Sequence, residues 1–365
     1  MTKEEIQQIK SRQLDQLADY RKTLYVKPEL RKLFFELTMQ CNEHCFHCGS
    51  RCERQTNQTN EHGLPLEKYK EILNEVKQNF DIRNIQLCIT GGEPLLYPHF
   101  FELMEYAHSL GYRWGMTSNG TLITKETAAR LRTAGMGTIS ISIDGLAETH
   151  DRLRGLTGGY QMAMTGIQNL IDETCFHNIQ VTTVVNHENI SELDALYEIF
   201  ESIDIDSWRV IGLEPIGRAL DYPELMLTPA DQQRLFAFIK EKREAQIPVE
   251  YGCSHFLGLE YEREVRDWYF LCAAGIYVAG IMANGDIGAC LDIERRPETI
   301  QGNVYKDRFT DVWNNRFSLF RKPLSEKNTE CSECAYENWC AGGAHHSWDY
   351  DDNTQRICFK GVLFQ

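Results

Sequence analysis

The sequence lacks the features of a membrane, exported or nucleic-acid-binding protein. Its first residues mix charges with glutamines and contain no apolar core of the kind that an export signal needs. The longest charge-free apolar stretch, around residues 271–283, is shorter than the roughly 18 residues of a spanning helix. There are 53 acidic and 38 basic residues, a net charge of −15, and hence no overall basic field to hold a phosphate backbone. We therefore predict a cytoplasmic protein with neither membrane nor nucleic acid as a partner.

Internal repeats, low-complexity tracts and Gly/Ser-rich linkers are also missing. The chain has 365 residues, of which 42% are hydrophobic, an ordinary fraction for a folded protein. A chain of this length corresponds to about two domains, or to one barrel-sized domain with an appendage.

Short apolar runs alternate with amphipathic patterns over the first two thirds of the chain. The runs cover residues 33–39, 85–90, 112–117, 138–143, 179–185 and 208–213. The helical patterns cover residues 66–80, 100–110, 125–134, 160–173 and 191–203. Strict alternation predicts an α/β fold with a parallel sheet. Six such units are fewer than the eight of a closed barrel, so a partial barrel and an open doubly wound sheet both fit.

Residue composition and hydrophobic patterning divide the chain into four parts. Residues 1–30 form a polar helical extension, 31–225 the α/β core, and 226–249 a linking helix. Residues 250–365 are rich in cysteine and aromatic residues and contain Asn284-Gly285, a turn signal between two apolar runs. We predict a small α+β domain with a β-hairpin there.

Thirteen cysteines are many for a chain without an export signal, and clustered ones then favour metal ligands over disulfides. Cys41, Cys45 and Cys48 follow the first predicted strand, at the carboxyl end where parallel sheets place their active sites. Three thiolates can hold three irons of a [4Fe–4S] cluster and leave the fourth iron open. The alternative is a zinc site completed by His44 or His47.

This Cys-x3-Cys-x2-Cys motif, with Gly91-Gly92-Glu93-Pro94 after the second strand, closely resembles the radical S-adenosylmethionine (radical SAM) superfamily over about residues 32–219. The resemblance implies a partial (β/α)6 barrel whose cluster is held by Cys41, Cys45 and Cys48. It further implies that the open iron chelates S-adenosylmethionine, and that reductive cleavage yields a 5′-deoxyadenosyl radical that abstracts a hydrogen atom.

The resemblance also suggests the residues that contact S-adenosylmethionine. Glu93 and nearby carbonyls receive its ammonium group, Arg154 pairs with its carboxylate, and His47 lies against the adenine. The whole predicted set is His47, Gly91, Gly92, Glu93, Pro94, Ser118, Asn119, Ser142, Asp144 and Arg154. Read without the family, the glycine segment is an ordinary turn, Arg154 a solvated side chain and His47 a polar loop residue.

A second set of cysteines resembles the SPASM extension of radical SAM enzymes. Six of its seven cysteine positions match: Cys272, Cys290, Cys331, Cys334, Cys340 and Cys358. The seventh is Ala344. The resemblance implies a distal auxiliary [4Fe–4S] cluster on Cys331, Cys334, Cys340 and Cys358. A proximal cluster would keep Cys272 and Cys290 and recruit Cys253, His345 or His346, retain an open iron, or be absent.

Two other readings of these cysteines stay open. Shorter relatives would combine Cys272 and Cys290 with Cys331 and Cys334 in one cluster, and Cys-x2-Cys pairs also hold structural zinc. Cys52, Cys88 and Cys175 are assigned no chemistry.

The resemblance implies an enzyme, and the leading prediction is that it modifies a ribosomally made peptide by cross-linking, epimerisation or oxidation. The alternative is a dehydrogenase or mutase acting on a small molecule such as a sugar or tetrapyrrole. From another class, the chain could be a non-catalytic iron–sulfur electron-transfer protein. A radical enzyme would also need a flavodoxin or ferredoxin as reductant.

Overall fold

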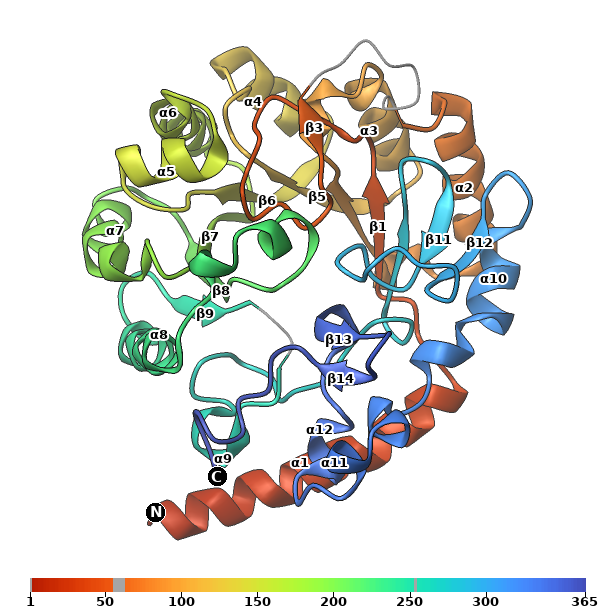
Figure 1. Ribbon diagram of the computed structural model, residues 1–365. Helices are drawn as coiled ribbons and strands as arrows, with labels where there is room; N and C mark the ends of the chain where they lie inside the picture. The colour runs from red at the N-terminus through yellow and green to blue at the C-terminus, as the bar shows by residue number, and fades with distance from the viewer. Residues whose placement is uncertain (1, 55–62, 253–254) are drawn as a thin grey trace.

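The computed structural model describes residues 2–54, 63–252 and 255–365. Within these residues, one ten-stranded sheet has the order β12-β11-β10-β1-β4-β5-β6-β7-β8-β9. Its strands are β1 (Lys32–Glu36), β4 (Gln86–Thr90), β5 (Arg113–Ser118), β6 (Met136–Ser142), β7 (Asn178–Val185), β8 (Ser207–Gly212), β9 (Val249–Tyr251), β10 (Val278–Ile281), β11 (Asp286–Gly288) and β12 (Ile300–Asn303). The sheet curves around its own interior, with the helices on its outer side (Figure 1).

The six predicted strand units are confirmed, from β1 to β8. Neighbouring strands in this part of the sheet are all parallel, for example with Phe35 beside Ile89. Helices follow them where the sequence predicts them: α2 (Leu66–Asn79), α3 (Phe100–Ser109), α4 (Lys125–Thr133), α6 (Gly159–Asp172), α7 (Leu193–Glu201) and α8 (Pro229–Lys242). A further helix, α5 (Ala147–Arg154), was not predicted. Helix α2 shows why: its buried residues Tyr69, Ile72, Leu73 and Val76 recur at helical spacing and face the sheet. The two ends of the described sheet, β12 and β9, do not pair, which agrees with a partial barrel.

The sheet continues into the cysteine-rich part of the chain. Strand β10 runs parallel to β1, with Lys32 beside Val278, and β11 returns antiparallel to β10. The turn between them is the predicted Asn284-Gly285 hairpin, in which Gly285 has a φ of +90° that favours glycine. Strand β9 extends the opposite edge beside β8. Both edges of the barrel therefore lead directly into the C-terminal segment.

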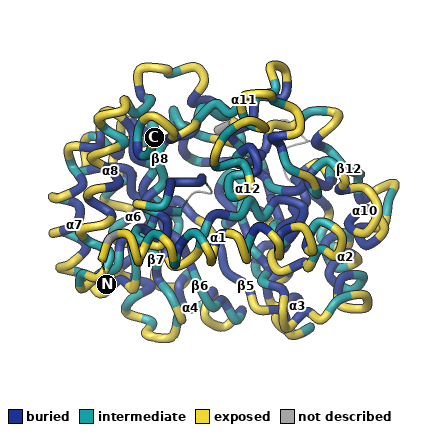
Figure 2. The backbone as a smooth tube through the Cα atoms, turned by 90° about the horizontal axis from the view of Figure 1, so that it is seen from below, coloured by how far each residue is buried: buried dark blue, intermediate teal, exposed yellow. Residues whose placement is uncertain are grey.

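The N-terminal helix α1 (Lys3–Val26) is attached to that C-terminal segment rather than to the barrel strands. Arg21 donates hydrogen bonds to the carbonyls of Trp339 (3.0 Å) and Asn338 (2.7 Å), and Asp15 accepts one from the Trp339 indole (2.8 Å). Figure 2 shows α1 lying across α12 (Glu337–Cys340) with its outer face exposed. No helix in the described ranges combines the length and hydropathy needed to cross a bilayer.

Candidate active site

The three clustered cysteines lie where the chain leaves the first strand. The cysteine loop, residues 41–52, starts at Cys41 of the short strand β2 (Gln40–Cys41) and ends before β3 (Glu53–Arg54), which pairs with β2 in parallel. Each thiolate would raise the pKa of its neighbours, since Cys41 and Cys48 both act on Cys45. Burial raises the pKa of Cys45 most, and the contributions of Cys48 and Cys41 show that the three thiols lie close enough to interact electrostatically.

Two neighbouring elements hold the loop through its backbone. The amides of His44 and Phe46 donate to the carbonyls of Arg154 and Leu153 at the end of α5, each at 2.9 Å. These carbonyls have no partner inside the helix, so the loop satisfies them. From the other side, Arg218 donates to the carbonyls of Cys45 (2.8 Å) and Cys52 (2.7 Å).

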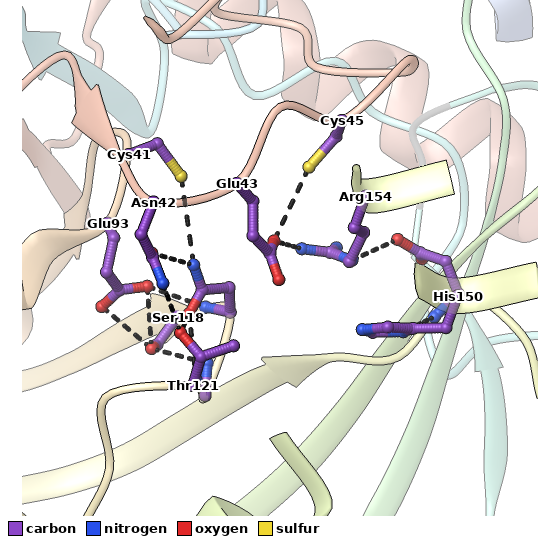
Figure 3. Close-up of polar contacts among 12 residues, drawn as sticks. Cys41, Asn42, Glu43, Cys45, Glu93, Ser118, Thr121, His150 and Arg154 are labelled. Atoms are coloured by element: carbon purple, nitrogen blue, oxygen red, sulfur yellow. Dashed lines mark hydrogen bonds and ion pairs between the residues drawn. The ribbon is translucent and has the colours of Figure 1, made fainter. Parts of the chain in front are cut away.

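A buried charge network joins the loop to α5 and β6. Arg154 Nη1 lies 2.7 Å from Glu43 Oε2, and Arg154 Nε lies 2.7 Å from Asp144 Oδ2. The same Asp144 oxygen is 2.9 Å from His47 Nε2, and its other oxygen accepts from the Val184 amide at 2.7 Å. Figure 3 shows Glu43 and Arg154 beneath Cys45. Arg154 thus ties the cysteine loop to the carboxyl end of the sheet.

The network shifts the pKa values of its members. Burial alone would raise the pKa of Asp144, but Arg154 and His47 outweigh it and lower that pKa. Burial works against the charge of Arg154 as well, and Asp144 and Glu43 nevertheless raise its pKa well above the ordinary value. For His150, burial followed by the charge of Arg154 lowers the pKa to about 4. At neutral pH Arg154 is therefore positively charged, Asp144 is negatively charged and His150 is neutral.

Glu93 lies in a second polar group at the ends of β4 and β5. Its fully buried carboxylate accepts hydrogen bonds from Ser118 Oγ at 3.0 Å and from the Asn119 amide at 2.9 Å. Burial raises the pKa of Glu93 to about 7 although these hydrogen bonds lower it. The Asn119 side chain then donates to Asn42 Oδ1 at 2.8 Å and toward Cys41 Sγ at 3.9 Å. This chain of contacts connects Glu93 to the first cysteine.

The two glycines before Glu93 bring backbone against backbone. A Cβ on Gly92 would lie 1.9 Å from the carbonyl oxygen of Gln40, and one on Gly91 would lie 2.6 Å from that of Thr38. The Gly92 amide donates to the Thr38 carbonyl at 2.7 Å, and the Glu93 amide donates to the Gln40 carbonyl at 2.8 Å. The glycines are required here because the segment packs directly on the chain that leads into Cys41.

The remaining predicted cofactor residues lie around these two groups. Pro94 is buried at the start of a 3₁₀ helix, Pro94–Leu96, and Ser142 is half-buried as the last residue of β6. Ser118 and Asn119 are both buried at the end of β5. Cys253 falls outside the described residues.

Side-chain chemistry at the loop suits an iron–sulfur cluster. Burial raises the pKa of Cys41 to about 12 and raises that of Cys45 well above its ordinary value. The Cys52 thiol donates to Cys48 and lowers the Cys48 pKa, while its own pKa rises. Three thiols on one loop, held by Arg154 through Glu43 and by Arg218 through two carbonyls, are the donor set that a cluster with one open iron needs.

The C-terminal cysteines gather in two groups. Burial, then the charges of Cys358, Cys331 and Cys334, raise the pKa of Cys340 to about 12, so these four thiols lie close enough to interact electrostatically. Cys272 acts in the same way on Cys290, which follows strand β11. The first group has the four thiols of a complete cluster site.

Ala344 lies between the two groups. Its side chain is fully buried and packs with Leu14, Phe256 and Phe270, and Cys272 and Cys340 border the same cluster. The amide of His345 donates to Cys272. A hydrophobic contact therefore occupies the place of the missing cysteine.

Glu43 is a contributor that sequence reasoning missed, and Arg218 is one whose segment, residues 215–219, fits the family pattern but was given no definite role. Both are buried. Glu43 lies within the cysteine loop and pairs with Arg154, and Arg218 donates hydrogen bonds to carbonyls of that loop. A charged residue inside a buried cysteine run signals that a partner is needed, but it does not say where that partner lies.

Two family models match the chain: the radical SAM superfamily over residues 35–200 and an iron–sulfur cluster-binding domain, SPASM, over residues 272–335. The cofactors are accordingly [4Fe–4S] clusters and S-adenosylmethionine.

Several curated proteins are similar along most of their length. The mycofactocin maturase MftC of Mycobacterium tuberculosis is 32% identical over 319 residues, covering 85% of this chain and 77% of that protein. The AdoMet-dependent heme synthase of Methanosarcina barkeri is 29% identical over 327 residues, covering 86% and 90%. Among solved structures, that of Streptococcus suis SuiB bound to S-adenosylmethionine superposes with a TM-score of 0.72 at 21% identity, covering 92% of this chain and 77% of that one.

Proposed function

Because the chain belongs to the radical SAM superfamily and carries a SPASM domain, we propose that it cleaves S-adenosylmethionine reductively and modifies a ribosomally made peptide. The convergence of three loop thiols with the Glu93 and Arg154 groups supports the first half of this proposal. When bound, the cluster supplies the electron that breaks the sulfonium bond and so generates the radical that abstracts hydrogen.

The protein residues then have distinct tasks. Cys41, Cys45 and Cys48 hold the cluster, and Asn119 donates toward Cys41 from the β5 end. Glu93, Ser118 and Asn119 provide the polar surface for the methionyl ammonium, while Pro94, Gly91 and Gly92 set its backbone. Asp144, Ser142 and His47 face the ribose and adenine. Arg154 positions the loop through Glu43 and offers positive charge to the cofactor carboxylate.

The auxiliary assignments follow the two cysteine groups. Cys331, Cys334, Cys340 and Cys358 hold a distal cluster, and Cys272 and Cys290 contribute to a proximal one. Such centres would take up the electron that the substrate radical releases and pass it to an external acceptor. The reductant that we expect for cleavage of S-adenosylmethionine is a flavodoxin or ferredoxin.

A peptide substrate is supported by similarity to the mycofactocin maturase and to Streptococcus suis SuiB, which was solved bound to precursor peptide SuiA, and a tetrapyrrole by similarity to heme synthases. We favour the peptide because identity to the maturase is the higher of the two. Helix α1 is bound to the C-terminal segment, so peptide recognition falls to the barrel mouth or to a separate protein.

Anaerobic incubation with S-adenosylmethionine and dithionite tests the first half. We expect 5′-deoxyadenosine from the wild type and from Cys175→Ala, which alters an exposed thiol, and none from Cys45→Ala. Formation of 5′-deoxyadenosine by Cys45→Ala would refute the cluster assignment. Adding precursor peptides or iron porphyrins separates the substrates, because only the true substrate changes mass and increases the yield.

A further inference from the structure

We propose that Glu214, His255 and His346 form a mononuclear binding site for a divalent first-row metal ion, zinc(II) or iron(II), distinct from the cysteine sites. One ligand atom from each residue lies within 4.8 Å of the other two. The three come from separate segments: Glu214 follows β8, His255 follows β9, and His346 lies in the 3₁₀ helix His345–Ser347 of the C-terminal segment.

The distances suit a metal better than direct hydrogen bonds. His255 Nε2 is 3.3 Å and His346 Nε2 is 3.7 Å from the same oxygen, Glu214 Oε1. Ligands at about 2.0–2.1 Å from a tetrahedral ion are about 3.3 Å apart, so little movement is needed to bring all three onto one ion.

Burial makes the arrangement costly without such a partner. His255 is 3% and Glu214 7% exposed. Both Nε2 atoms are buried, and their contacts with Glu214, at 3.3 and 3.7 Å, are longer than well-formed hydrogen bonds. Buried polar nitrogens are rarely left in this state, and a cation held by two imidazoles and a carboxylate satisfies both at once.

The surroundings of His255 are those of a ligand held in place. Its other ring nitrogen, Nδ1, lies 2.9 Å from the Tyr251 hydroxyl, as metal-binding histidines commonly use that atom for an orienting hydrogen bond. Arg266 fixes the backbone by donating to the His255 carbonyl at 2.7 Å. The rings of His255 and His346 are 5.4 Å apart at 75°, so they do not stack and both can point at one centre.

Two imidazoles and one carboxylate restrict the metal ions that this site can bind. This set binds zinc(II), or iron(II) as a facial triad, and both leave positions for water or another ligand. Because the site joins the β8 and β9 ends to the C-terminal segment, a bound ion would also fasten the two parts together.

Metal and sulfide analysis of the reconstituted, desalted holoprotein tests the proposal. Cluster iron and sulfide are equal in number, so zinc, or iron in excess of sulfide, counts the additional ion. We expect about one such ion per chain in the wild type and in His99→Gln, an exposed histidine, and its loss in His346→Gln with cluster iron and sulfide unchanged. An equal excess in the wild type and His346→Gln, or no excess even after dialysis against equimolar zinc, would overturn the proposal.

X-ray absorption on the zinc-loaded wild type gives a test that needs no variant. We expect a nitrogen and oxygen shell at about 2.0–2.1 Å. A sulfur shell at about 2.3 Å would instead place the ion on cysteines and refute the site. Neither result depends on cleavage of S-adenosylmethionine.

Discussion

Arg154 and Glu43 form a buried ion pair, with Nη1 2.7 Å from Oε2, across 111 residues of sequence. Arg154 is the last residue of α5 and Glu43 stands between two cysteines of the loop. A positive charge suits a helix C-terminus, and this one has two carboxylates to neutralise it. The geometry of the cluster site therefore depends on a contact far from it in sequence.

Replacing Arg154 with methionine should destabilise the protein strongly. The change leaves Glu43 and Asp144 buried without their guanidinium, a situation that costs about 3–5 kcal/mol. Arg152→Met is the matched control on the same helix, because Arg152 pairs with Glu188 at the surface, where such pairs contribute below about 1 kcal/mol. Urea unfolding midpoints of the holoproteins would measure the difference. Equal midpoints for the two variants would contradict the role of Arg154.

Glu93 should make stability depend on pH. Burial raises its pKa to about 7 from the ordinary value of 4.5, so the folded state favours the protonated acid. This contribution is fully present below about pH 4.5 and disappears as the pH rises through about 7, a change of about 3 kcal/mol. Compared with Glu93→Gln, the wild type should lose relative stability between pH 5 and 8. The free energy of unfolding, measured at several pH values in this range, should therefore change differently with pH in the wild type and in Glu93→Gln. The exposed control, Glu102→Gln, should follow the wild type.

Ala344→Cys should add a ligand to the proximal group. Ala344 is fully buried in the cluster that Cys272 and Cys340 border, so a thiol there faces both. If the proximal site lacks a full cluster, iron should rise by about four per chain. Ala344→Ser is the control of equal size, because a hydroxyl is a poor cluster ligand. Identical iron and sulfide contents in both variants would show that position 344 does not limit assembly.

The alternation of apolar runs and helical patterns was enough to predict the parallel core. Strands β4 to β8 begin and end within two residues of the predicted runs, because buried parallel strands are continuously apolar and short. The sequence did not predict that β10 pairs with β1. That pairing joins Lys32 to Val278, and no local pattern encodes a register across so many residues.

The candidate site divides in the same way. Spacing identified the cysteines and the glycine segment, since ligands on one loop leave a local signature. Arg154 was expected to be a cofactor contact or a solvated side chain. The structure excludes the solvated side chain by burying Arg154 between Glu43 and Asp144, and the cofactor contact stays a prediction. Partners of buried charges come from distant segments, so only the folded chain identifies them.

Arg218→Met should weaken retention of the loop's cluster. The Arg218 side chain donates to the carbonyls of Cys45 and Cys52, and the Arg218 backbone amide donates to the Cys48 carbonyl at 3.0 Å. Losing the two guanidinium bonds leaves both carbonyls unsatisfied at about 1.5–3 kcal/mol each, so iron loss to a chelator should accelerate at least roughly tenfold. Arg51→Met is the control, because Arg51 binds Asp221 at the surface of the same region. The comparison measures iron release after mixing with chelator under anaerobic conditions. If Arg51→Met and Arg218→Met released iron at the same rate, the loop would be held by its cysteines alone.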